Sequence, residues 1–130
     1  MADYLPIYLP GQAVPMTTSA SVTGGTLAEV TGDGTVGPAA AGSAKVIGTF
    51  GTDAASGARV TVYCRGAVHE AVNSGGVTAG AQLVSAANGQ VASKAAASGA
   101  TAGDINDARS IVGIALTTAT TTNKVRFVAL

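Results

Sequence analysis

The sequence predicts an all-β protein, a small β-sandwich or barrel made of two pseudo-repeated β units behind an extended N-terminal arm. Three observations predict this class: a self-match within the chain, short β-branched runs separated by glycine-rich turns, and a proline-rich start. A fixed-period self-match constrains the whole fold, because each copy is expected to form the same local unit. Short strands at regular spacing, with turn residues between them, are typical of small sandwiches and barrels.

The self-match aligns Lys45–Arg65 with Ser110–Leu130 without a gap, so that Gly48 falls on Gly113, 65 positions later. A second match, at a displacement of 55 positions, places Val36 on Val91 and brings Leu27 within one position of Leu83. The change from 55 to 65 requires ten additional residues in the second half, since 65 − 55 = 10. Ser98–Asp107 has the composition of a surface loop and is the predicted insertion.

The expected elements follow from residue type and periodicity. Asn88-Gly89 is the strongest hairpin signal, because both residues accept a positive φ at low cost. Val60 and Val62 alternate with Arg59 and Thr61, which is the period of a half-buried strand. The predicted strands and turns, in order, are a short strand before the Gly24-Gly25 turn, a strand ending at Val30, the Gly32–Gly34 turn, a strand at Lys45–Thr49, a loop at Gly51–Gly57, a strand at Arg59–His69 and a Gly75-Gly76 turn.

Residues 1–16 differ from the rest of the chain. They hold three of the four prolines and two of the five aromatic residues, and proline disfavours a regular central strand or helix. We expect an extended arm that docks on a partner; an edge strand packed on its own domain is the alternative. The candidate binding residues are Tyr4, Leu5, Pro6, Ile7, Tyr8, Leu9 and Pro10. The remaining residues, 17–130, are predicted to form a single β domain with pseudo-repeats at about 17–72 and 73–130 and the insertion near 98–107.

Composition limits the possible functions. Charged residues make up 11% of the 130 residues and the formal net charge is zero, so no basic footprint for nucleic acid is present. Apolar runs are far shorter than a membrane span, and no secretory signal pattern opens the chain. Aromatic residues are only 4%, and 18 glycines raise the entropic cost of folding. We therefore expect an oligomer to supply additional buried surface.

No candidate active site emerges from the motifs. Gly32–Gly37 matches the letters of a dinucleotide fingerprint but lacks the helix that holds the pyrophosphate, and Gly37–Lys45 has its lysine misplaced for a phosphate loop. His69 is the only histidine and Cys64 the only cysteine; strand alternation puts them on opposite faces. Asp104 and Asp107 lie in the insertion without an acid–base partner. We expect no enzyme activity, cofactor or metal.

The order of the short motifs resembles that of the capsid cement, or head decoration, proteins of tailed double-stranded DNA phages. The pieces that carry the resemblance span nearly the whole chain: Gly11–Val14, Val22–Gly25, Val30–Val36, Val46–Gly48, Gly57–Val62, Val77–Gly80, Asn88–Val91, Ile111–Leu116 and Val125-Arg126.

The resemblance implies a small β protein, usually trimeric, that binds the major capsid protein on the outer surface of the mature head and stabilises the lattice. It implies synthesis in the host cytoplasm and residence in the virion, without direct contact to nucleic acid or membrane. The visible internal repeat departs from the decoration protein of phage lambda. Other phage structural β proteins, associated with a tail tube or a fibre, and a carbohydrate-binding β module displayed on the virion remain alternatives.

Overall fold

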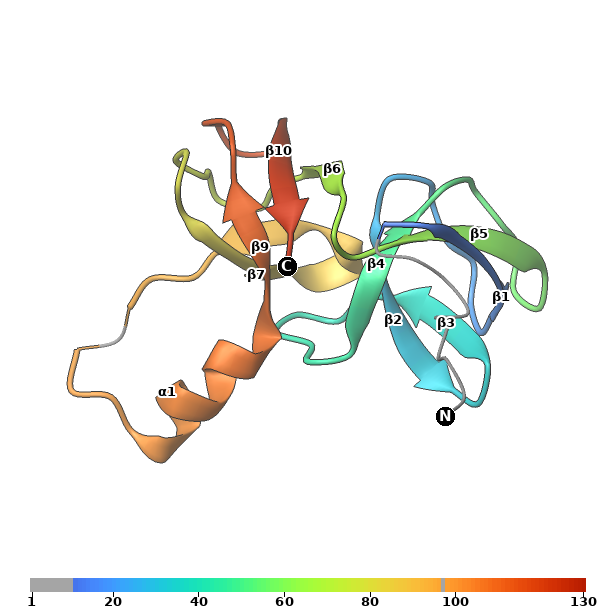
Figure 1. The fold of residues 1–130 in the computed structure, drawn as a ribbon, viewed down its shortest axis with the longest axis horizontal. Helices are drawn as coiled ribbons and strands as arrows, with labels where there is room; N and C mark the ends of the chain where they lie inside the picture. The colour runs from blue at the N-terminus through green and yellow to red at the C-terminus, as the bar shows by residue number, and fades with distance from the viewer. Residues whose placement is uncertain (1–10, 97) are drawn as a thin grey trace, which may run out of the picture.

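The computed structural model describes residues 11–96 and 98–130. Two β units lie side by side, the N-terminal unit on the right of Figure 1 and the C-terminal unit on the left. Each unit contributes five strands, and an insertion with a short helix projects from the second unit. The predicted all-β class is confirmed.

The first unit is a closed barrel with the strand order β1-β3-β2-β4-β5. Strand β1 closes it, because β1 pairs antiparallel with β5 and parallel with β3. Closure removes the free edges through which β proteins aggregate. The strands are β1 (Ala13–Thr18), β2 (Leu27–Gly32), β3 (Thr35–Pro38), β4 (Val46–Phe50) and β5 (Arg59–Cys64).

The second unit is a five-stranded sheet with the order β6-β10-β9-β7-β8. A parallel bridge between Asn73 and Val91 joins the two ends of this sheet, and it corresponds to the Thr18–Val36 pair of the barrel 55 positions earlier. The second unit therefore repeats the closure of the first. Its elements are β6 (Val68–Val72), β7 (Gln82–Ser85), the 3-10 turn η1 (Ala87–Gly89), β8 (Val91–Ser93), α1 (Ala102–Asp107), the 3-10 turn η2 (Ala108–Ser110), β9 (Ile111–Ala115) and β10 (Lys124–Ala129).

Gly48 and Gly113 explain part of the self-match. A Cβ at Gly48 would overlap the backbone carbonyl of Tyr63, and a Cβ at Gly113 would overlap that of Val128, which is again 65 positions later. Each glycine thus lets its strand, β4 or β9, lie against the next strand without steric conflict. The repeat preserves these glycines because no other residue fits there.

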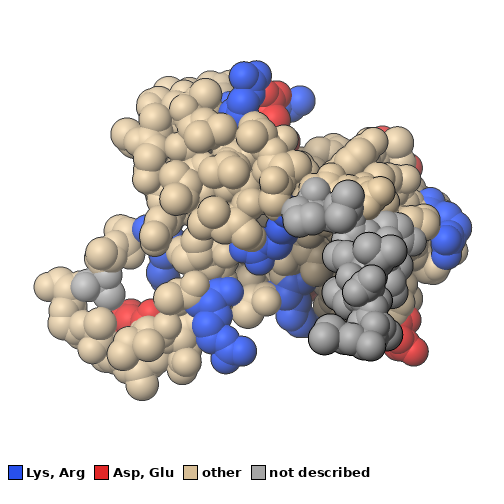
Figure 2. Space-filling view, viewed as in Figure 1, with Lys and Arg blue, Asp and Glu red and all other residues tan. Residues whose placement is uncertain are grey.

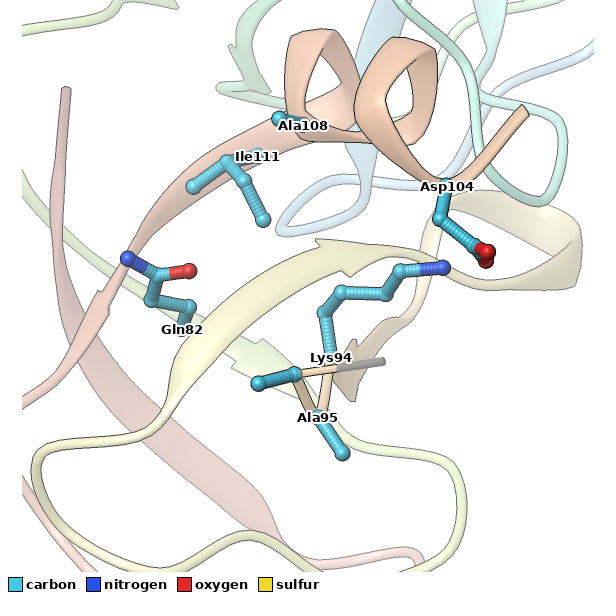
Figure 3. A pocket seen from close by; sticks show the side chains of 7 residues that line it. Gln82, Lys94, Ala95, Asp104, Ala108 and Ile111 are labelled. Carbon is cyan, nitrogen blue, oxygen red and sulfur yellow. The ribbon is translucent and has the colours of Figure 1, made fainter. Parts of the chain in front are cut away.

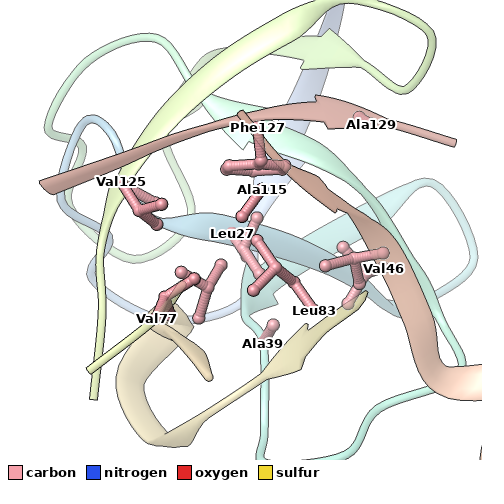
Figure 4. Packing of buried hydrophobic residues seen from close by; sticks show 12 residues of the cluster. Leu27, Ala39, Val46, Val77, Leu83, Ala115, Val125, Phe127 and Ala129 are labelled. Atoms are coloured by element: carbon pink, nitrogen blue, oxygen red, sulfur yellow. The ribbon is translucent and has the colours of Figure 1, made fainter. Parts of the chain in front are cut away.

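Two clusters of buried residues form the core. The smaller cluster belongs to the barrel and includes Val36, Phe50 and Val62. The larger cluster fills the second unit and also takes in Leu27, which is 1% exposed, together with two further first-unit residues, Ala39 and Val46. Figure 4 shows Leu27 among the side chains of the second unit, so the larger cluster extends across the junction between the units.

The structure corrects the predicted positions of Leu27 and Leu83. The register partner of Gly48 is Ala28, and that of Gly113 is Leu83, so Ala28 and Leu83 are the true equivalents at a displacement of 55. The one-position slip of the self-match is therefore wrong. Leu27 instead points across the junction into the second unit's core.

The predicted strand Arg59–His69 is also wrong in its length. Strand β5 ends at Cys64, the chain turns at Gly66 with φ of 99°, and β6 begins at Val68. Within β5 the predicted alternation holds, since Val60 and Val62 are buried. The turn separates the two units. Their strands therefore start at residues 13 and 68, whereas the pseudo-repeats were predicted to begin near 17 and 73.

Two further differences concern the predicted arm and the short strand predicted before Gly24. Residues 13–16, the last four of the predicted arm, lie in β1, where Pro15 is tolerated because β3 pairs with β1 only at Thr17 and Thr18. The short strand expected before Gly24 is reduced to an isolated bridge at Val22.

The Asn88-Gly89 hairpin is confirmed, with φ of 57° and 71° at the two residues.

Candidate interaction surface

The residues with the most reactive side chains do not form a catalytic group. His69 Nε2 lies 3.2 Å from the backbone carbonyl oxygen of Cys64, and its ring centroid is 5.9 Å from that of Phe127. Burial raises the pKa of the Cys64 thiol, which lowers its fraction of reactive thiolate at neutral pH. The His69 ring is thus held by a hydrogen bond and a ring contact, and the Cys64 thiol is partly buried.

The glycine motif Gly32–Gly37 is not followed by the helix that a dinucleotide fingerprint requires. It forms the β2–β3 hairpin, and the element that follows it is strand β4. Within residues 11–96 and 98–130, no group of three or more His, Cys, Asp or Glu residues is placed to hold a metal ion. In the same ranges, no helix is long and apolar enough to cross a membrane.

The insertion between β8 and β9 is where the second unit departs most from the first. The predicted surface loop contains the six-residue helix α1, which begins behind a capping box. The hydroxyl of Thr101 accepts the N–H of Asp104 at 3.3 Å, and the Asp104 carboxylate accepts the N–H of Thr101 at 2.8 Å. These hydrogen bonds with Thr101 lower the pKa of Asp104, because they favour its charged form.

The insertion is held in place mainly by polar contacts. Lys94 forms an ion pair of 3.0 Å with Asp107, and the Ser110 hydroxyl donates to the Asp107 carbonyl at 2.6 Å. None of the six residues of α1 is buried, and Ile105 on this helix is 67% exposed. Because no residue of α1 is buried, this helix adds nothing to the hydrophobic core and is held by polar contacts at the surface.

A shallow hollow of about 190 Å³ lies between the insertion and the sheet of the second unit. Figure 3 shows Lys94 reaching across it toward Asp104, with Ala108 and Ile111 on the facing wall. Its lining residues are Gln82, Lys94, Ala95, Ala96, Asp104, Ala108 and Ile111. Small apolar side chains dominate one wall, and the hollow holds neither a nucleophile–base pair nor a phosphate cradle.

The junction between the units is organised by Arg65, which immediately follows β5. Its guanidinium donates to the carbonyl oxygen of Ile111 at 2.7 Å and to that of Val46 at 3.3 Å. Val46 and Ile111 are equivalent residues, 65 positions apart, so one side chain ties together the same point of both units. Partial burial lowers the pKa of Arg65.

A second set of hydrogen bonds closes the junction. The Ser85 hydroxyl donates to the Ala40 carbonyl at 2.7 Å and accepts the Ser43 N–H at 3.0 Å. The Ser85 carbonyl accepts the Gly42 N–H at 2.8 Å. Because Ser85 belongs to β7 and its partners to the β3–β4 connection, the two units are held in one arrangement.

The predicted binding arm is not placed. Tyr4, Leu5, Pro6, Ile7, Tyr8, Leu9 and Pro10 lie outside the described residues. Sequence reasoning found the insertion but missed its helix, although Thr101-Ala102-Gly103-Asp104 has the spacing of a capping box. It also missed Arg65, whose role depends on the contact between the units and leaves no local pattern.

Neither a protein-family model nor a curated protein matches the chain. Among solved structures, the chain is similar to the head fiber gp8.5 N base in bacteriophage phi29, with a TM-score of 0.63 and 17% sequence identity. The match covers 92% of this chain and 93% of that chain. At this identity the likeness establishes a shared fold: the two-unit β architecture described above is also that of a phage head-fiber base.

Proposed function

We propose that the chain is a structural protein of a phage head, a decoration (cement) protein that binds the outside of the mature capsid and stabilises the major-capsid lattice. The observation that carries the proposal is the fold likeness, over nearly the full length of both chains, to the base of a phage head fiber. The motif order of phage decoration proteins points to the same class of function.

The mechanism is thermodynamic. A protein that binds the assembled, expanded lattice but not its broken form shifts the equilibrium toward the lattice by mass action. A homo-oligomer, for which we propose a trimer, would bind several major-capsid subunits at once and gain avidity without additional contacts. The protein would reside on the outer capsid surface of the virion and act without enzyme activity, cofactor, nucleic acid or membrane.

Two segments are suited to contact the lattice. The arm, with Tyr4, Ile7 and Tyr8 among its anchors, carries apolar side chains in a proline-rich context that favours extended binding. The insertion presents Ile105 on a helix that is ordered before binding, which reduces the entropy lost on association. Both segments lack a counterpart in the other half of the repeat.

A second candidate is the base of a head-attached fibre, favoured by the name of the similar structure. Both candidates require attachment to the head. They differ in that a fibre base also carries a fibre, whereas a decoration protein does not. Negative-stain microscopy of heads mixed with the purified protein distinguishes them from a tail-tube function, because that function predicts undecorated heads.

The test uses purified protein and undecorated, expanded heads. Deletion of residues 2–10 is expected to weaken head binding at least tenfold, about 1.4 kcal/mol, while the circular dichroism spectrum stays that of the folded domain. Ile105→Ser should weaken binding as well, whereas the matched control Leu116→Ser, at a residue 49% exposed, should not. Full-affinity decoration by the truncated protein would show that the arm is not the binding segment.

A further inference from the structure

The distribution of charge on the junction face is uneven although the net charge is zero. In Figure 2, Lys and Arg side chains gather along the junction between the two units, whereas the acidic side chains on this face lie away from it, including some on the projecting insertion. Such a separation creates a local positive potential at the junction even though the net charge of the chain is zero.

We define the junction cluster as Arg65 together with the cations next to its two partners in the chain, Lys45 and Arg109. Arg65 donates to the carbonyls of Val46 and Ile111, so it lies between the starts of β4 and β9. Lys45 precedes Val46 directly, and Arg109 lies two residues before Ile111. The contacts of Arg65 therefore bring together two segments whose cations, Lys45 and Arg109, are 64 residues apart in the chain.

Lys45 and Arg109 are exposed, and neither forms an ion pair with any residue of the described ranges. The neighbouring acids have other partners. Asp107 pairs with Lys94 at 3.0 Å, and the buried Glu29 carboxylate accepts the Ala40 N–H at 3.3 Å. The charges of Lys45 and Arg109 are thus available to an external partner, whereas the guanidinium of Arg65 is engaged by the carbonyls of Val46 and Ile111.

We propose that the junction cluster docks on a carboxylate-rich protein surface, which on the proposed function is an acidic patch of the capsid lattice. Arginine binds carboxylates with two parallel hydrogen bonds, and lysine adds a mobile charge. Duplex DNA fits less well, since three cations release few counterions and supply little of the affinity that nucleic-acid binding requires.

The test compares two double variants with the same change of charge. Lys45→Glu with Arg109→Glu reverses the cluster. Arg59→Glu with Lys124→Glu is the matched control, because these residues are exposed, equivalent in the repeat and without ion pairs in the described ranges. A third variant, Lys45→Gln with Arg109→Gln, removes the charge without introducing repulsion.

Binding is measured to a poly-L-glutamate layer, to duplex DNA and to undecorated heads. At roughly 0.01 M ionic strength, reversal of the cluster should slow association with poly-L-glutamate and with heads about tenfold, and the neutral variant should have a smaller effect. The difference should shrink at roughly 0.15 M, where charges are screened within about 8 Å. The control variant should remain within about twofold of the parent protein.

Equal losses in the control variant, or no loss in the reversed variant, would overturn the proposal. Stronger binding of the parent protein to DNA than to poly-L-glutamate, abolished by the reversal, would assign the cluster to nucleic acid instead. If the parent protein binds poly-L-glutamate but not heads, the decoration function fails while the cluster's chemistry stands. If heads are bound equally by parent and reversed proteins, the function stands and the docking surface is wrong.

Discussion

The two units place their large core side chain on different strands. In the barrel, Phe50 on β4 faces Val62 on β5; in the second unit, Ala115 on β9 faces Phe127 on β10. These are the same register pair, 65 positions apart, and all four residues are 2% exposed or less. The repeat therefore keeps one aromatic ring at this register pair but moves it to the other strand, with Val62 opposite the ring in the barrel and the smaller Ala115 opposite it in the second unit.

The largest expected effect tests this change in the position of the ring. Phe50→Ala should destabilise the protein by about 3–5 kcal/mol, because it leaves a cavity in the barrel. Adding Val62→Phe to that variant copies the second unit and should restore about half of the loss or more, although Val62→Phe alone should cost about 1–3 kcal/mol by overpacking. Urea denaturation measures all three variants. A double variant no more stable than Phe50→Ala would contradict equivalence of the two sites.

The second prediction concerns the two glycines that the units share. Gly48→Ala and Gly113→Ala should each cost about 3 kcal/mol, because the new Cβ has no space beside the carbonyl of Tyr63 or Val128. Gly103→Ala, in the exposed helix α1, is the control and should stabilise by up to about 1 kcal/mol through helix propensity. Denaturation midpoints that stay unchanged for Gly48→Ala would rule out the close strand contact.

Buried polar residues at equivalent positions allow a third comparison. Asn73 donates to the carbonyls of Thr120 and Asn123, both at 2.8 Å, and accepts the Gly76 N–H at 2.7 Å. Its equivalent Thr18 has a single hydroxyl proton, which is shared between the carbonyls of Ala55 at 2.6 Å and Ala58 at 3.3 Å, and its oxygen accepts the Ala58 N–H at 3.2 Å. Loss of a buried partner costs about 1–3 kcal/mol, so Asn73→Ala should lie at the upper limit and Thr18→Ala near the lower one. Thermal unfolding of the two variants should show this order, and the reverse order would count against it.

The smallest effect isolates backbone strain. Thr122 has φ of 68°, and its equivalent Gly57 has φ of 79° with open space around its missing Cβ. A β-branched residue is disfavoured in this region by about 1–2 kcal/mol. Thr122→Gly should therefore stabilise the second unit, and Gly57→Thr should destabilise the first by a similar amount. Calorimetry on both variants checks the sign, and two shifts of the same sign would refute the strain.

The local patterns of the sequence predicted much of the fold. The paired glycines, the alternation of Val60 and Val62 and the Asn88-Gly89 turn each depend on short-range geometry that residue types encode. The end of β5 was missed because apolar and polar residues continue to alternate past the turn at Gly66.

Contacts between the units could not be predicted in this way. Leu27 resembles Leu83 in sequence, yet it packs into the opposite unit, and a single chain gives no local mark of such a contact. The segments that carry Lys45 and Arg109 likewise meet at Arg65, which donates to one carbonyl of each. The insertion was located by the change of displacement from 55 to 65 positions. Its helix was missed because it depends on the capping box of Thr101 and Asp104, which composition alone does not reveal.

The most direct test of the decoration function is to mix the purified protein with undecorated, expanded heads and count the copies bound per capsid at saturation. The account predicts saturable binding on the outer surface, at a fixed number of copies set by the lattice symmetry, and heads that resist heat or chelator better once decorated. Binding that does not saturate, or heads that remain bare at concentrations where the protein is folded, would contradict it.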